Sequence, residues 1–276
     1  MTVRDRLRGG PTILAMGGGG FTMEPDNPAL DDFVLSLVDR PEPRVLFLPT
    51  ASGDPTAHIT AFYARYARAA SATHLSLFRR HGSARTLADI VLEQDVIYVG
   101  GGSMRNLLAI WRAHELDELL VEAWRRGIVL AGLSAGAMCW FAGGVTRSSG
   151  PLEVIEGLGL LPGSFTVHAD GEPERLPVWL AAVRSGELPG GWAADDGVGL
   201  LFRGTRMVRV VSSRPGTAAL RADAVGDELV RHRIEPELLG VDPTRPPTPA
   251  TLPVPDDIRE LRELRDMRAA GGLRRI

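Results

Sequence analysis

Short apolar runs alternate along the first half of the chain with longer segments of mixed polarity. Each run has the length of a strand buried on both faces and is too short for a buried helix. Strands are therefore expected at residues 12–16, 44–49, 73–78, 95–99 and 128–131. Helical spacing and capping residues predict helices at 27–38, 56–70, 104–126 and 135–141. This alternation predicts an α/β fold, with a doubly wound, mostly parallel sheet and helices on both faces.

The pattern changes after residue 160. We expect strands at 164–168 and 192–195, an antiparallel pair at 198–202 and 207–211, and edge strands at 218–222 and 229–234. A helix is expected to open at 170–175 and to run to about residue 183. The sequence thus predicts a small antiparallel addition near the C-terminus, which completes a single α/β domain over residues 1–240. Residues 241–276 read as a proline-rich linker and a charged helix.

Composition excludes several kinds of chemistry. The net charge of −3 gives no basic surface for nucleic acid. All 31 basic residues are arginine, which excludes Schiff-base, Ser-Lys and P-loop chemistry. The single Cys139 excludes an internal disulfide and a cysteine zinc cluster, and we expect no metal or cofactor. With no apolar leader and no apolar run of membrane-spanning length, we expect a cytoplasmic monomer or homodimer that acts on a small molecule.

The segment 128–141, IVLAGLSAGAMCWF, carries the first candidate for chemistry. Small residues lie two positions before and two after Ser134, as a strained turn from a strand into a helix requires. Such a turn exposes the serine hydroxyl at the carboxyl end of a strand. The backbone N–H groups that follow it point toward an anion forming on a substrate. The pattern indicates a nucleophile at Ser134.

Two further glycine-rich turns follow predicted strands. The turn at 17–20 lacks the last glycine of a dinucleotide fingerprint, since Thr22 occupies that position, and we expect a tight turn close to a ligand instead. The turn at 100–103 can bring backbone N–H groups close to a substrate carbonyl. In a doubly wound sheet this second turn and Ser134 share one edge.

A serine nucleophile requires a base within hydrogen-bond reach. Of the six histidines, His168 is the one that ends a predicted strand and precedes a polar turn. We therefore expect His168 to lie within hydrogen-bond reach of Ser134.

Several segments together resemble the peptidase E family of serine peptidases, whose relatives include cyanophycinases. The resemblance covers residues 12–223 and rests on VGGGS at 99–103, GLSAGA at 132–137, the segment 157–168, GEPER at 171–175 and ADDGVGLLF at 194–202. It implies a class I glutamine amidotransferase-like fold, Ser134 as nucleophile and His168 as base. It also implies an oxyanion hole formed by the N–H groups of Gly101 or Gly102 and of Ala135.

The acid of the catalytic triad departs from the family pattern. In the resembling proteins it lies in the stretch that matches 146–149, where this chain has Arg147 and no acid. A guanidinium cannot accept the imidazole N–H, and loss of the acid lowers turnover by about 10⁴. Other residues can supply the acceptor: Glu153, Asp195, Asp196 or Asp170, or, more weakly, Ser148 or Ser149.

The resemblance also suggests a substrate, because relatives cleave Asp-X dipeptides or a β-aspartyl-arginine polymer. Arg147 and Arg175 are candidates for binding a substrate carboxylate, and Glu172 for binding an amino terminus. We expect Arg147 to turn away from His168, toward an acid, solvent or the substrate.

These observations favour a serine peptidase or amidase that hydrolyses a small peptide through an acyl-enzyme. One alternative is an α/β-hydrolase-type esterase, which would use His232 with Asp195, Asp196 or Asp223. The other is a binding or regulatory protein that has kept the serine turn but lost the acid, as Arg147 suggests.

Overall fold

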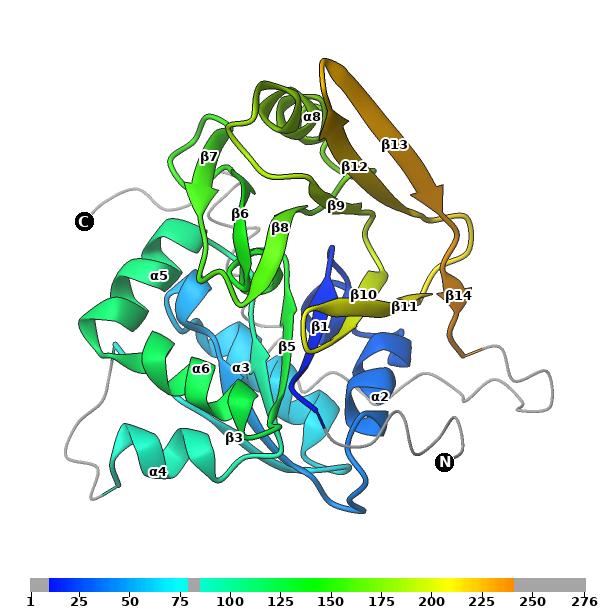
Figure 1. Ribbon diagram of the computed structural model, residues 1–276. Helices are drawn as coiled ribbons and strands as arrows, with labels where there is room; N and C mark the ends of the chain where they lie inside the picture. The colour runs from blue at the N-terminus through cyan, green and yellow to red at the C-terminus, as the bar shows by residue number, and fades with distance from the viewer. Residues whose placement is uncertain (1–9, 79–84, 241–276) are drawn as a thin grey trace, which may run out of the picture. The chain divides into compact units, whose positions relative to one another are not determined.

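The computed structural model describes residues 10–78 and 85–240 (Figure 1). The predicted linker and charged helix at 241–276 lie outside the described residues. Within the described residues no helix has the length and apolar character needed to cross a membrane.

The first sheet has eight strands in the order β14-β11-β10-β1-β5-β4-β2-β3. Strands β1, β5, β4, β2 and β3 are parallel, β10 and β11 continue the sheet antiparallel, and β14 pairs parallel to β11. This is the predicted doubly wound, mostly parallel sheet. The bounds are β1 Thr12–Met16, β2 Arg44–Leu48, β3 Ser71–His74, β4 Val96–Val99, β5 Val129–Leu133, β10 Val198–Arg203, β11 Arg206–Ser212 and β14 Glu237–Leu238.

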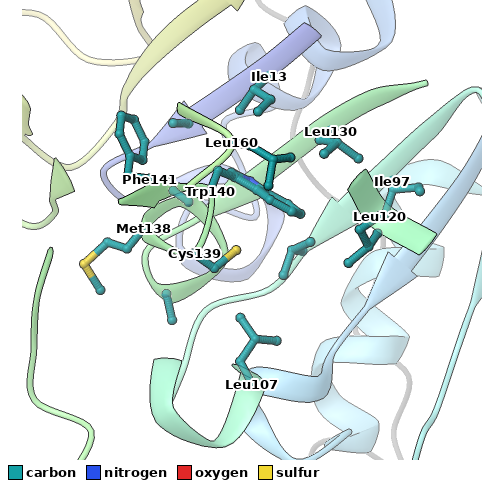
Figure 2. Packing of buried hydrophobic residues seen from close by; sticks show 14 of the residues in the cluster. Ile13, Ile97, Leu107, Leu120, Leu130, Met138, Cys139, Trp140, Phe141 and Leu160 are labelled. Carbon is teal, nitrogen blue, oxygen red and sulfur yellow. The ribbon is translucent and has the colours of Figure 1, made fainter. Parts of the chain in front are cut away.

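Helices cover both faces of this sheet, which explains the unbroken apolar runs of its strands. Within β1, Ile13 faces one core and Leu14 the other, and both are fully buried. The first core packs against α4–α6, and Figure 2 shows Trp140 in its middle. The second packs against α1–α3. The bounds are α1 Gly20–Met23, α2 Ala29–Ser36, η2 Thr50–Ser52, α3 Thr56–Tyr66, α4 Leu87–Leu92, α5 Met104–Ala113 and α6 Leu116–Arg125.

A second sheet was not predicted in this form. It has six strands in the order β13-β12-β9-β8-β6-β7, with α8 packed against it through Trp179 and Val183 (Figure 1). The predicted antiparallel pair is β10–β11 of the first sheet. The strands expected at 218–222 and 229–234 correspond to β12 and β13, which pair antiparallel in the second sheet, whereas β6, β8 and β9 pair in parallel. The bounds are β6 Phe141–Thr146, β7 Glu153–Glu156, β8 Leu161–Thr166, α8 Arg175–Ser185, β9 Gly191–Ala194, β12 Ala219–Val225 and β13 Glu228–Ile234.

The prediction was wrong directly after the serine turn. The helix expected at 135–141 is the single turn α7, Ala135–Met138, and strand β6, Phe141–Thr146, begins where that helix was expected to end. Positions 143 and 144 require glycine, because a Cβ on either would collide with the carbonyl oxygen of a residue on an adjoining strand, Ile155 or Phe165. Glycine in β6 therefore marks close strand packing rather than a turn.

Other differences concern boundaries. The third strand lies at Ser71–His74 rather than 73–78, and α3 ends at Tyr66. The helix expected at 104–126 is divided at Glu115, which has a φ of 56°. The helix expected to open at 170–175 begins only at Arg175.

Candidate active site

Ser134 occupies a strained turn between β5 and α7. Its φ of 53° and ψ of −119° lie outside the regions that non-glycine residues favour. The small flanking residues are required sterically, because a Cβ at Gly136 would lie 2.5 Å from the Val99 carbonyl oxygen and one at Gly132 would collide with the Gly136 carbonyl. The Ser134 N–H donates to the carbonyl of Met16 at 3.0 Å, which ties the turn to β1. The sequence prediction of this turn is confirmed.

His168 lies next to Ser134, as predicted. Its Nε2 is 2.8 Å from Ser134 Oγ, and its side chain is 14% exposed. The residue follows β8 and also has a left-handed backbone, with a φ of 53°. Two hydrogen bonds fix its backbone. Its N–H donates to the carbonyl of Gly17 at 3.3 Å, and its carbonyl accepts from the Glu172 N–H at 2.8 Å.

Asp196 completes the hydrogen-bonded chain. Its Oδ1 lies 2.5 Å from His168 Nδ1, and its side chain is 15% exposed. Asp196 occupies the turn between β9 and β10, and its backbone N–H donates to Asp170 Oδ1 at 2.8 Å. A Cβ at Gly18 would collide with Oδ1 of Asp196, and one at Gly171 would lie 3.1 Å from Oδ2. The two glycines thus make room for this carboxylate.

The other acids considered at the sequence level have different partners. Asp195 Oδ2 accepts from the Ala218 N–H at 2.8 Å, and burial raises the pKa of its carboxyl. Glu153 pairs with Arg105 at 2.9 Å, which lowers the pKa of that carboxyl. Asp170 holds the backbone of Asp196 rather than the imidazole of His168. Of the four candidates, the structure places Asp196 at the imidazole.

The glycine turn 100–103 lies against the serine turn. A Cβ at Gly101 would lie 3.2 Å from Ser134 Cβ, and one at Gly102, with a φ of 140°, would collide with the Ala51 carbonyl. Among the residues that the structure describes, no acceptor takes the N–H of Gly101, Gly102 or Ala135. The protein itself therefore does not occupy the three predicted oxyanion-hole donors within the part of the chain that the structure describes.

A cavity of about 280 Å³ opens at Ser134 and His168. Its wall includes Arg147, Glu172 and Arg175, the three residues predicted to contact substrate. The remaining lining residues are Gly102, Ser103, Met138, Thr146 and Ser148.

The three charged residues are not equivalent. Arg175 is 5% exposed, and its Nη1 donates to the Val145 carbonyl at 2.7 Å. Its Nη2 donates to both carboxylate oxygens of Glu172, each at 2.8 Å. Arg147 is 42% exposed, and it pairs with Glu174 at 2.9 Å and more loosely with Glu172 at 3.6 Å. Arg147 therefore turns to acids rather than to His168, as expected.

Cys139 and His232 lie in other environments. Cys139 is fully buried, its Sγ donates to the Gly136 carbonyl at 3.2 Å, and burial raises the pKa of its thiol. His232 is an exposed residue of β13, the edge strand of the second sheet, whereas His168 occupies the position at Ser134. The α/β-hydrolase arrangement with His232 as base is therefore wrong.

Comparisons with known proteins identify what the chain resembles. The family model described as Peptidase family S51 matches residues 13–210. The uncharacterized peptidase YgaJ of Bacillus subtilis (strain 168) is 47% identical over 229 residues, which cover 83% of this chain and 99% of that protein.

Two solved structures share the fold at low identity. A peptidase from an acI-B1 Actinobacterium matches with a TM-score of 0.62 at 20% identity, covering 80% of this chain and 94% of that one. A putative peptidase E protein from Listeria monocytogenes EGD-e matches with a TM-score of 0.53 at 17% identity, covering 72% and 98%.

Proposed function

The chain belongs to peptidase family S51 and is a serine peptidase, and we propose that it cleaves small peptides through an acyl-enzyme on Ser134, with His168 as base and Asp196 as acid. The observation that carries this mechanism is the continuous hydrogen-bonded chain from Ser134 Oγ through both imidazole nitrogens to Asp196 Oδ1.

In the first step His168 Nε2 takes the proton of Ser134 as Oγ attacks the carbonyl carbon of the scissile bond. The N–H groups of Gly101 or Gly102 and of Ala135 bind the oxygen that becomes negative. The imidazolium then protonates the leaving amine, and the acyl-enzyme forms. Water activated by the same imidazole hydrolyses this ester and regenerates Ser134.

Asp196 keeps the imidazole in the productive tautomer. Its Oδ1 accepts the Nδ1–H of His168, which leaves Nε2 unprotonated and directed at Ser134. The carboxylate also stabilises the imidazolium that forms during attack. The position of this acid supports an active enzyme over a catalytically impaired homologue.

For the substrate we favour a dipeptide-like molecule with an acidic residue at its amino terminus. Arg175 is saturated by Glu172 and by the Val145 carbonyl, so it is not available to a ligand without losing buried bonds. Arg147 is the accessible cation of the cavity. Its exposed ion pairs contribute little to stability and are readily exchanged for a substrate carboxylate.

The proposal is tested by assaying Asp-X, β-Asp-X, neutral and blocked dipeptides with the wild type, Ser134→Ala and Arg147→Gln. We expect Asp-X to be cleaved fastest, Ser134→Ala to be inactive, and Arg147→Gln to raise KM for acidic substrates alone. Equal rates on acidic and neutral dipeptides in both active proteins would reject the substrate class while leaving the mechanism intact. Turnover by Ser134→Ala would reject the mechanism.

A further inference from the structure

The turn 195–198, which carries Asp196, is held through the backbone N–H groups of its residues. Three of these groups donate to main-chain carbonyls: Asp195 to Ala218 at 3.1 Å, Gly197 to Gly18 at 3.2 Å, and Val198 to Asp195 at 3.2 Å. The N–H of Asp196 donates instead to a side chain, at 2.8 Å from Oδ1 of Asp170. The residue that contacts the imidazole is thus the one whose backbone position depends on another side chain.

Asp170 belongs to the segment that carries the base. It lies two residues after His168, between β8 and α8, so its carboxylate joins this segment to the turn of the acid. The neighbouring Ala169 N–H donates to the carbonyl of Ala194, the residue before the turn, at 3.1 Å. The backbone bond and the Asp170 side chain together hold the two segments side by side, where Asp196 Oδ1 lies 2.5 Å from His168 Nδ1.

The residue after Asp170 borders the carboxylate of Asp196. A Cβ at Gly171 would lie 3.1 Å from Asp196 Oδ2. Asp170 therefore binds the backbone of the acid, and the glycine that follows it borders one carboxylate oxygen. The other oxygen, Oδ1, is directed at the imidazole of His168. Residues 170 and 171 thus act together on where this carboxylate lies.

The hydrogen bond of Asp170 can be separated from its charge. Asp170 is exposed and does not line the catalytic cavity, and among the described residues the Asp196 N–H is the one hydrogen-bond partner of its side chain. Its substitution therefore removes a single contact and opens no void in the core. The charge also reaches the turn, because burial raises the pKa of the Asp195 carboxyl and the charges of Asp170 and Asp196 add to that rise.

We propose that Asp170 is a positioning residue for the triad, which accepts the N–H of Asp196 and so places its carboxylate where Oδ1 accepts the Nδ1–H of His168. This inference rests on the proposed function, in which that contact selects the productive tautomer. Without the bond, Asp196 moves, and part of the imidazole carries its proton on Nε2, where it cannot take the proton of Ser134. The bond rather than the charge has this effect, so an uncharged acceptor of the same length can replace Asp170.

The kinetic test compares Asp170→Ala, which removes the acceptor, with Asp170→Asn, which keeps an acceptor oxygen but carries no charge. Asp170→Ala should lower kcat about tenfold or more and change KM less than about twofold, because the cavity wall is untouched. Asp170→Asn should restore kcat to within about threefold of the wild type. Asp227→Ala, at an exposed residue of the turn between β12 and β13, is the control and should keep the wild-type kinetics.

The tautomer of His168 is measured without a substrate, by NMR of the full-length protein with ¹⁵N-labelled histidine at a pH where the imidazole is neutral. The chemical shifts of the two ring nitrogens, detected through the carbon-bound ring protons, report which nitrogen carries the proton. His168→Gln identifies the signals of this residue among those of the six histidines. We expect the Nδ1–H tautomer in the wild type and Asp170→Asn, and a mixture in Asp170→Ala. Both variants should have a Tm within about 4 °C of the wild type.

The proposal is overturned if Asp170→Ala keeps the wild-type kcat and tautomer, or if Asp170→Asn is as impaired as Asp170→Ala, which would assign the effect to the charge. An equal loss of kcat in Asp227→Ala would also overturn it. An Nε2–H tautomer in the wild type would reject both this proposal and the mechanism proposed above, because Asp196 would not orient the imidazole. An Nδ1–H tautomer in the wild type and in Asp170→Ala would reject this proposal alone, so the two failures are distinguishable.

Discussion

The backbone of Gly18 lies so close to Asp196 that a Cβ at position 18 would collide with the carboxylate oxygen that contacts His168. The same Cβ would lie 3.0 Å from His168 Cε1. The glycine turn after β1, which resembles part of a dinucleotide fingerprint, therefore serves a different purpose. It lets the backbone pass beside the acid and the imidazole, and so fixes where both can lie.

Gly18→Ala should lower kcat without unfolding the protein. The new methyl group displaces Asp196 or His168, and a displacement of about 1 Å in a catalytic group lowers rates about 10²-fold. Gly10→Ala is the matched control, because a Cβ at position 10 meets nothing within 4 Å. Steady-state kinetics with circular dichroism check the result. Equal activity in the two variants would show that Gly18 does not constrain the acid.

Asp196→Asn should lower kcat by about 10⁴, because the amide no longer stabilises the imidazolium or selects the same tautomer. Asp195→Asn supplies the comparison from the adjacent position, where the side chain accepts from the Ala218 N–H instead. That variant should retain activity within about tenfold of the wild type. If Asp195→Asn proved the more damaging change, the assignment of the acid would be wrong.

Ser134→Ala should abolish both turnover and covalent labelling by a fluorophosphonate probe. Cys139→Ala should keep both, because the thiol is fully buried and its raised pKa disfavours the thiolate. Intact mass spectrometry measures the labelling, and thermal unfolding confirms that both variants are folded. Labelling of the Ser134→Ala protein would place the nucleophile elsewhere.

The sequence sufficed to predict the parts of the site that local sterics determine. Ser134 was identifiable because a strained turn needs small residues at fixed offsets. The buried strands were identifiable as unbroken apolar runs, because helices cover both faces of the sheet. Asp196 could not be chosen among the candidate acids. Its contact with His168 depends on the parallel pairing of β8 with β9 in the second sheet, which brings the residues that follow the two strands side by side.

The second sheet was predicted only in part, for a related reason. Strand β6 contains Gly143 and Gly144, and two adjacent glycines are locally typical of a turn. In the structure they are strand residues, and glycine fits there because neighbouring strands approach closely. The glycine turn at 100–103 was predicted to supply N–H groups to an oxyanion hole, whereas the turn at 17–20 was predicted only to lie close to a ligand. The contact of the Gly18 backbone with Asp196 and His168 was not predictable, because it depends on segments that are distant in the sequence.

Arg147 and Arg175 should respond oppositely to substitution by glutamine. Arg175→Gln breaks a buried bidentate pair with Glu172 and should lower the free energy of unfolding by about 1–3 kcal/mol. Arg147→Gln should leave the unfolding midpoint unchanged but raise KM for acidic dipeptides. Urea unfolding and kinetics on an acidic and a neutral dipeptide separate the two. Loss of stability in Arg147→Gln without a change in KM would reject its role in substrate binding.

Asp31 should make the stability of the protein depend on pH between about pH 4 and 7. Its carboxyl is fully buried, and burial, opposed only in part by Arg65 and Tyr66, raises its pKa from 3.8 to about 6. The folded state therefore keeps the proton to higher pH than the unfolded chain does. The stabilisation is complete below pH 3.8 and is lost as the pH rises through 6.

The shift corresponds to about 3 kcal/mol, since one pKa unit is about 1.4 kcal/mol. Asp31→Asn keeps a similar shape but cannot ionise, so the free energy of unfolding of this variant should rise relative to that of the wild type by up to that amount between about pH 4 and 7. Asp227→Asn, at an exposed residue of the turn between β12 and β13, is the control and should run parallel to the wild type. Urea unfolding across this pH range measures all three proteins. A constant difference between Asp31→Asn and the wild type would mean that the buried carboxyl does not titrate there.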